Sequence, residues 1–154
     1  MLIITGASGG IGRYLVEKLS SEFQIVGTYN SNKPSNKYDN VEYFKVDTTN
    51  SNDIAQFMSS VSNRLKDIVL INVAGVSIDG VGHKMDEETW DKVIDTNLKG
   101  TFLMSRAMLP LMRQQNWGRI INFSSIVGQV GIPGTVAYSS SKSGLMGLTR
   151  TLQG

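Results

Sequence analysis

The stretch that decides the fold opens the chain and reads "MLIITGASGGIG" (residues 1–12). Its apolar start predicts a buried strand, and the glycines that follow predict a tight turn into a helix. Glycines let the backbone approach a phosphate group closely, and the free amide groups of a helix N-terminus attract an anion. The stretch therefore predicts a phosphate-binding loop. The alternative is a glycine-rich turn that only packs a helix against a strand.

The rest of the chain alternates apolar runs with helical patterns. Helices are predicted over about 10–20, 52–64 and 87–115, and from about residue 138. The four further strands are predicted at "QIVGTY", "VEYFKV", "DIVLIN" and "GRIINF". Such continuously apolar strands are typical of a parallel sheet with helices on both faces. Right-handed crossovers then give a doubly wound, Rossmann-type α/β fold with strand order 3-2-1-4-5, lacking the C-terminal strands of that architecture.

Composition narrows the class of protein. The 154 residues, 40% hydrophobic and 18% charged, predict one globular domain over residues 1–154. No apolar run is long enough to span a membrane, and the net charge of +2 comes without a basic run, so neither membrane nor nucleic acid is a predicted partner. Because Met1 leads directly into a strand, we expect no signal peptide and a cytoplasmic protein. Without cysteine there is no thiolate chemistry, and no metal site is predicted.

The glycine spacing G-x-x-x-G-x-G over residues 6–12 resembles the short-chain dehydrogenase/reductase family. The resemblance implies that this loop binds a nicotinamide dinucleotide. It carries over a set of cofactor-binding positions at and around the motif: Thr5, Gly6, Ser8, Gly10, Ile11 and Gly12.

The segment "TYNSNK" (residues 28–33), at the end of the second strand, bears on the choice of cofactor. An acid here would bind the ribose hydroxyls of NAD, and none is present. Asn30 and Ser31 are the predicted contacts, and Ser31, Asn32 and Lys33 can donate to a 2′-phosphate. We therefore expect NADP rather than NAD. Against this, Gly9 stands where many NADP-using relatives carry a basic residue, and Lys33 has the alternative of a solvated loop charge.

Two further segments match the family at the ends of strands. Asp47 follows the third strand, where the family has an acid that contacts the adenine; a helix N-terminal acid or cap is the alternative. "INVAG" (residues 71–75) resembles the family's N-N-A-G motif, with Val73 as the departure. The resemblance makes Asn72, Ala74 and Gly75 cofactor-binding positions, where small residues allow close approach.

Tyr138 and Lys142 are the predicted catalytic pair. Reduction of a carbonyl by a nicotinamide needs a proton donor, and a tyrosine, with an ordinary pKa near 10, needs a nearby cation that stabilises the phenolate. The i,i+4 spacing puts both side chains on one helical face. That spacing alone is common on helix surfaces. In the family the same pair catalyses the reaction and contacts the cofactor.

Ser125 and Asn97 complete the predicted tetrad. Ser125 lies at the carboxyl end of the fifth strand, where ligands sit in this architecture, and the family's serine there hydrogen-bonds the substrate carbonyl. Ser124 would point to the opposite face. Asn97 lies inside a helical region in which asparagine is unfavourable, which predicts a local kink. In the family this asparagine distorts the helix and holds a water that relays protons toward the lysine.

The resemblance covers the whole chain but only the N-terminal part of a typical family member. We therefore expect the native protein to continue after residue 154, and the fifth strand of this chain to form an exposed apolar edge. The missing part of the family fold carries most of the substrate specificity.

The resulting functional expectation is an NADP-dependent reductase of a 3-oxoacyl-type carbonyl, most similar to 3-oxoacyl-[acyl-carrier-protein] reductases. A small molecule or an acyl thioester is the expected substrate, and a homodimer or homotetramer the expected assembly of the full-length protein. The alternatives are a cofactor-binding fragment without turnover and a secondary-alcohol dehydrogenase of the same family. The glycine spacing disfavours the epimerase and dehydratase relatives.

Overall fold

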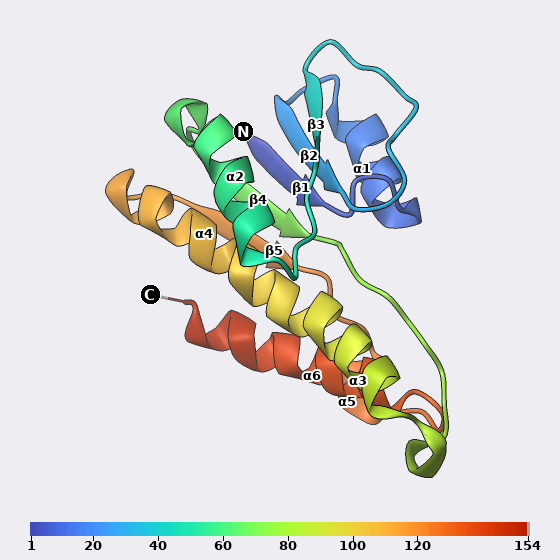
Figure 1. The fold of residues 1–154 in the computed structure, drawn as a ribbon. Coiled ribbons are helices and arrows are strands. Elements are labelled where there is room, and N and C mark those ends of the chain that lie inside the picture. Colours follow the sequence, from blue (N-terminus) through green and yellow to red (C-terminus); the bar gives the residue numbers. More distant parts are fainter. Residues whose placement is uncertain (154) are drawn as a thin grey trace.

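A computed structural model of the protein describes residues 1–153. Five strands form one parallel sheet in the order β3-β2-β1-β4-β5, which confirms the predicted doubly wound architecture (Figure 1). The strands are β1 (Leu2–Thr5), β2 (Ile25–Tyr29), β3 (Val41–Lys45), β4 (Val69–Asn72) and β5 (Arg119–Asn122).

Helices cover both faces of the sheet. They are α1 (Gly10–Leu19), α2 (Ser51–Val61), α3 (Glu87–Ile94), α4 (Gly100–Gln114), α5 (Val127–Val130) and α6 (Val136–Thr151), with 3₁₀ turns η1 (Ser62–Arg64) and η2 (Gly82–Lys84) and the π-helical segment η3 (Asp95–Lys99). The chain winds to one side through α1 and to the other through α2, α4 and α6 (Figure 1). This reversal between β1 and β4 leaves the carboxyl ends of those two strands as the expected ligand position.

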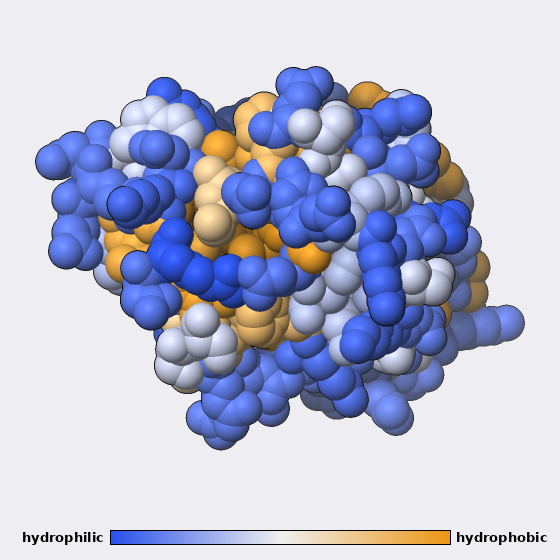
Figure 2. Space-filling view, turned by 90° about the horizontal axis from the view of Figure 1, so that it is seen from above, coloured by the Kyte–Doolittle hydropathy of each residue, from blue (hydrophilic) through white to orange (hydrophobic). Residues whose placement is uncertain are grey.

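Two apolar clusters flank the sheet. Alternate residues of β1 point to opposite faces: Ile3 packs with α2 and α4, whereas Ile4 packs with α1. On the face that Figure 2 shows, hydrophilic side chains predominate and border a central apolar area, with smaller apolar areas toward the right edge.

The predicted helix over 87–115 is not continuous. The π-helical segment η3 separates α3 from α4, and the Gly100 amide bonds back to the Asp95 carbonyl. Asn97, the residue that predicted a kink, lies in the middle of this segment and is completely buried. The irregularity is thus one widened turn, a feature often found at functional sites.

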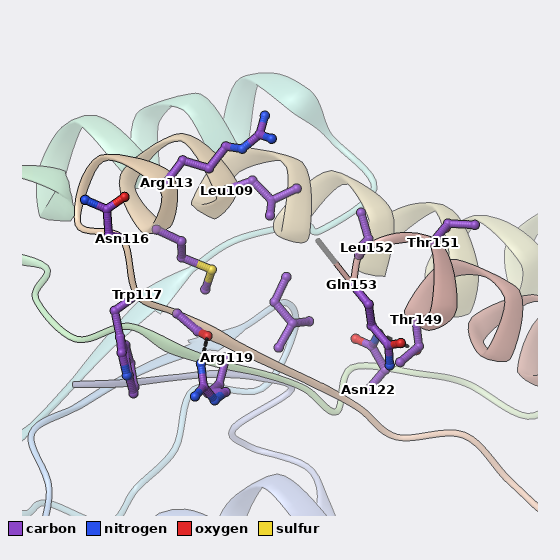
Figure 3. A pocket seen from close by; sticks show the side chains of 13 residues that line it. Leu109, Arg113, Asn116, Trp117, Arg119, Asn122, Thr149, Thr151, Leu152 and Gln153 are labelled. Carbon is purple, nitrogen blue, oxygen red and sulfur yellow. Dashed lines mark hydrogen bonds between the residues drawn. The ribbon is translucent and has the colours of Figure 1, made fainter.

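The edge of the sheet at β5 borders a cavity of about 860 Å³ (Figure 3). The cavity lies between the C-terminal ends of α4 and α6, and its apolar lining includes Leu109, Met112, Trp117 and Leu152. Within residues 1–153, β5 pairs only with β4, as the predicted apolar edge requires. Neither the glycine loop nor Tyr138 nor Lys142 lines this cavity.

Candidate active site

Two glycines, Gly6 in the loop between β1 and α1 and Gly12 in the first turn of α1, are required by the chain's own packing. Gly6 has φ +65°, and a Cβ added there would lie 2.8 Å from the Ala74 Cα. A Cβ on Gly12 would overlap the Gly6 carbonyl oxygen. Because the obstructing atoms belong to the backbone, neither position has room for a side chain.

Gly10 differs from both. A Cβ there would meet nothing within 4 Å, so the space above it is open. The first helical turn has no acid, and its N-cap, Gly9, offers no side chain to the free amide groups. Unfilled amides beside open space fit the diphosphate of a dinucleotide. Ser8 and the exposed Ile11 belong to the same loop and helix start.

Thr5 and Asn72 act as framework at the carboxyl ends of β1 and β4. The buried Thr5 hydroxyl accepts hydrogen bonds from the amides of Val73 and Ala74, each at 3.1 Å. The Asn72 amide group donates to Asn122 Oδ1 at 2.9 Å. Thr5 thereby holds the start of the loop after β4, whereas the buried Oδ1 of Asn72 has no hydrogen-bond partner within residues 1–153, and a cofactor contact by either residue stays a prediction.

Asp47 does not cap α2, so the capping part of that alternative is wrong. The cap is Asn50, whose side chain accepts from the amides of Asn52 and Asp53. Asp47 instead accepts hydrogen bonds from the amide and hydroxyl of Thr49, at 2.9 and 2.7 Å. The carboxylate closes the loop after β3, and an adenine contact stays a prediction.

Lys142 and Tyr138 share one face of α6. The Lys142 ammonium lies 5.6 Å from the centre of the Tyr138 ring and donates to the Phe123 carbonyl at 2.6 Å. Only 6% of Lys142 is exposed, and this burial lowers its pKa. The predicted pair is therefore brought together, with the cation partly stripped of water at the end of β5.

Asn97 lies next to this pair. Its Oδ1 accepts from the Val76 amide at 2.7 Å, and its Nδ2 donates to the Val76 carbonyl and to the Ser141 hydroxyl, at 2.8 and 3.0 Å. A Cβ on Gly75 would lie 3.1 Å from Asn97 Oδ1 and 3.7 Å from Lys142 Nζ. The loop after β4, η3 and α6 therefore converge at Gly75, which is itself exposed.

The two serines after β5 have different partners. The Ser124 hydroxyl donates to the Lys142 carbonyl at 2.8 Å. The Ser125 Oγ accepts a long bond of 3.4 Å from the Val127 amide, and among the described residues its hydroxyl proton has no acceptor. Ser125 is thus the serine free to donate to a ligand, which supports its choice over Ser124.

Sequence reasoning missed the bonds that attach α6 to β5. Besides Phe123 and Ser124, Asn122 takes part: its Nδ2 donates to the Thr149 hydroxyl at 2.9 Å, and Figure 3 shows the two side chains together. Three consecutive residues, Asn122 to Ser124, thereby form hydrogen bonds with α6. The available signal was Asn122 itself, a polar residue at the end of the apolar run "RIIN".

The remaining predicted cofactor residues, Asn30 and Ser31, lie exposed just beyond β2. Within residues 1–153 no group of three or more His, Asp or Glu side chains is placed to hold a metal ion. In that part of the chain, no helix combines the length and apolar character needed to cross a membrane.

The short chain dehydrogenase family profile matches residues 1–154. The chain belongs to this family. Curated relatives include the 3-oxoacyl-[acyl-carrier-protein] reductase FabG of Rickettsia conorii, 39% identical over 153 residues, and that of Staphylococcus epidermidis, 36% identical over 160 residues. Each match covers 97% of this chain, and it spans 64% of the first relative and 66% of the second.

Solved structures agree with the fold. A short chain dehydrogenase from Leptospira borgpetersenii with bound NAD+ superimposes with a TM-score of 0.90 at 32% identity, covering 98% of this chain and 63% of that one. A structure of ElxO with NADP bound superimposes with a TM-score of 0.87 at 26% identity, covering 96% of this chain and 64% of that one. These two neighbours carry different nicotinamide cofactors.

Proposed function

We propose that the chain is the cofactor-binding and catalytic-helix portion of a cytoplasmic, NADP-dependent reductase that acts on a 3-oxoacyl-type carbonyl. The observation that carries the proposal is the convergence of Asn97, Tyr138 and Lys142 beside the exposed Gly75, together with Ser125 and the open glycine loop. Family membership and the FabG relatives support the reaction class. Residues 1–154 form one nucleotide-binding domain in this proposal.

The cofactor would be held through the loop after β1. The free amides at the start of α1 bind its diphosphate, Gly10 gives it room, and Ala74 and Gly75 let it approach the end of β4. When bound, the nicotinamide supplies the hydride. NADP is proposed over NAD because residues 28–33 carry no acid that would repel a 2′-phosphate.

The protein supplies the proton and the orientation. Ser125 donates a hydrogen bond to the carbonyl oxygen, and Tyr138 gives its phenolic proton to that oxygen as negative charge develops there. The Lys142 ammonium, held by the Phe123 carbonyl, attracts the charge left on the phenolate. Asn97 fixes the loop after β4 beside Lys142, and in this proposal a water at η3 returns a proton toward the lysine.

An acyl thioester is the proposed substrate type, on the strength of the FabG relatives, and a homodimer or homotetramer the proposed assembly of the whole protein. A second candidate is cofactor binding without turnover. The observation in its favour is that the matches span only 64–66% of the FabG relatives, so the relatives contain residues that this chain does not match. A secondary-alcohol dehydrogenase would use the same groups in the opposite direction.

The test is reduction of an acetoacetyl thioester by NADPH. The rate is measured from the fall in NADPH absorbance. Tyr138→Phe should lower the rate at least ~10²-fold, the low end for lost acid catalysis, while NADPH still binds. Tyr14→Phe, on the exposed side of α1, is the matched control. Normal turnover by Tyr138→Phe would sink the mechanism. NADPH binding without any turnover by the parent chain would favour the second candidate, and equal affinity for NADH would overturn the cofactor preference.

A further inference from the structure

The helix α6, which carries the predicted catalytic pair, is attached to the end of β5 at two places. The first is at Lys142, whose ammonium donates to the Phe123 carbonyl and whose own carbonyl accepts from the Ser124 hydroxyl. The second is two turns further along the helix, where the Asn122 side chain donates to the Thr149 hydroxyl at 2.9 Å (Figure 3). A spacing of seven residues brings Lys142 and Thr149 to the same face of α6.

The bond between Asn122 and Thr149 is fixed in direction from both sides. Asn122 stands opposite Asn72 in the paired strands β4 and β5, and its Oδ1 accepts from the Asn72 side chain at 2.9 Å. The Thr149 hydroxyl donates its own proton to the Leu145 carbonyl at 2.7 Å, so it can only accept from Asn122. The Asn122 amide group therefore joins the sheet on one side to α6 on the other.

This second attachment controls the direction of the helix. At 1.5 Å per residue, Thr149 lies about 10 Å from Lys142 along the axis, and Tyr138 lies about 6 Å away on the other side. If α6 turned about Lys142, a displacement of roughly 1 Å at Thr149 would move Tyr138 by about 0.6 Å. Catalytic groups have to be held within about 0.5 Å of their productive positions, so a movement of this size matters.

The contacts of η3 with α6 do not replace this attachment. Asn97 donates to the Ser141 hydroxyl, and Leu98 packs against Gly144. Both contacts lie closer along the helix to Lys142 than to Thr149, where they oppose a turn of α6 only weakly.

We propose that Asn122 and Thr149 are positioning residues, which hold the C-terminal half of α6 on the sheet and thereby keep the Tyr138 phenol where it can protonate the substrate carbonyl. The proposal rests on the proposed reductase function. Neither residue touches the reacting atoms in it, since both act through α6. If the bond only satisfied the Asn122 amide group at the end of a strand, its loss would leave Tyr138 in place.

The first experiment is fluorine NMR of the full chain labelled with 3-fluorotyrosine, in which Tyr138→Phe identifies the Tyr138 signal. Thr149→Val removes the hydroxyl that accepts from Asn122, whereas Thr149→Ser keeps one. The Tyr138 signal should shift in Thr149→Val and return to its parent position in Thr149→Ser. Because Thr149 lies about 16 Å from Tyr138 along the helix, a direct effect of the lost hydroxyl is excluded.

The second experiment measures reduction of an acetoacetyl thioester by NADPH. Thr149→Val should lower kcat three- to tenfold with KM unchanged, less than the ~10²-fold expected for a full 1 Å misplacement, and Thr149→Ser should restore it. Asn122→Ala should lower kcat at least as much, because it loses the bonds to both Asn72 and Thr149. The matched control is Thr151→Val: the Thr151 hydroxyl bonds only carbonyls of its own helix, so kcat and the Tyr138 signal should stay unchanged.

The outcomes separate the positioning role from the proposed function. An unmoved Tyr138 signal or an unchanged kcat in a Thr149→Val chain that urea unfolding shows to be folded would overturn the positioning role. Equal effects of Thr151→Val would overturn it as well, since any lost hydroxyl on α6 would then suffice. Absence of turnover in the parent chain would contradict the proposed function, and the Tyr138 signal would still decide whether the bond positions α6.

Discussion

The glycine loop and the region around Lys142 are built in opposite ways. At the loop, a Cβ on Gly6 would meet the Ala74 backbone and a Cβ on Gly12 would overlap the Gly6 carbonyl oxygen, so the geometry requires that both positions lack a side chain. Around Lys142, buried polar side chains such as Asn97 join segments distant in sequence. The glycine loop should be destabilised when one carbon is added to a glycine. The region around Lys142 should be destabilised when a few polar side-chain atoms are removed.

The largest effect is expected for Gly12→Ala. Because its Cβ would overlap backbone, we expect it to lower the free energy of unfolding by more than about 3 kcal/mol, at the upper end for overpacking. Gly10→Ala, two residues away, meets open space and should change stability by less than about 0.5 kcal/mol while weakening NADPH binding. Urea unfolding and NADPH titration of both variants check this. Equal stability of the two variants would refute the backbone description of the loop.

Asn97→Ala tests the buried hydrogen bonds in the region around Lys142. It deprives the amide and carbonyl of Val76 and the hydroxyl of Ser141 of a partner, so a loss of about 2–3 kcal/mol is expected. Asn63→Ala, in the exposed turn η1, is the control and should be nearly neutral. A loss below about 0.5 kcal/mol in urea unfolding of Asn97→Ala would show that these bonds do not hold the region together.

Lys142→Met should separate stability from activity. Burial lowers the pKa of Lys142 below the ordinary 10.5, so the charged form is disfavoured in the folded chain. At neutral pH the variant should therefore be as stable as the parent or more so, by about 1 kcal/mol, while carbonyl reduction is lost.

The pH dependence of this difference has a definite sign. Between the folded-state pKa of Lys142 and 10.5 the unfolded chain binds more protons, so the parent gains stability as pH rises through that window. The variant lacks this gain, so its stability relative to that of the parent should fall as pH rises toward 10.5. A variant much less stable than the parent at neutral pH would contradict the prediction.

The smallest effect is expected at the surface. Arg64 hydrogen-bonds Glu42 and lowers the pKa of its carboxyl below 4.5. The stabilisation is present above that value and lost as pH falls through the folded-state pKa. Since the side chains of Arg64 and Glu42 are 38% and 56% exposed, Glu42→Gln should cost at most a few tenths of a kcal/mol at low salt and nothing at high salt. A salt-independent loss in urea unfolding would speak against an exposed pair.

The fold was predictable because its determinants are local or general. Continuously apolar strands and right-handed crossovers give the order 3-2-1-4-5 directly. The glycine loop was predictable for the same reason, because a side chain at Gly6 or Gly12 would clash with neighbouring backbone atoms. The i,i+4 spacing likewise brought Tyr138 and Lys142 together.

The partners of the polar residues were not predictable. Lys142 donates to a backbone carbonyl, that of Phe123, and a backbone acceptor has no signature in sequence. Asn97 indicated an irregular helix, but its bonds to Val76 and its π-helical form depend on how three segments meet.

The most direct test of the central claim, that both regions belong to one cofactor site, is amide hydrogen exchange of the chain with and without NADPH. Slower exchange is predicted in two places at once: the amides over residues 9–13, at the start of α1, and those over residues 74–76, between Asn97 and Lys142. Protection of one place without the other, or of neither at saturating NADPH, would contradict a single shared site.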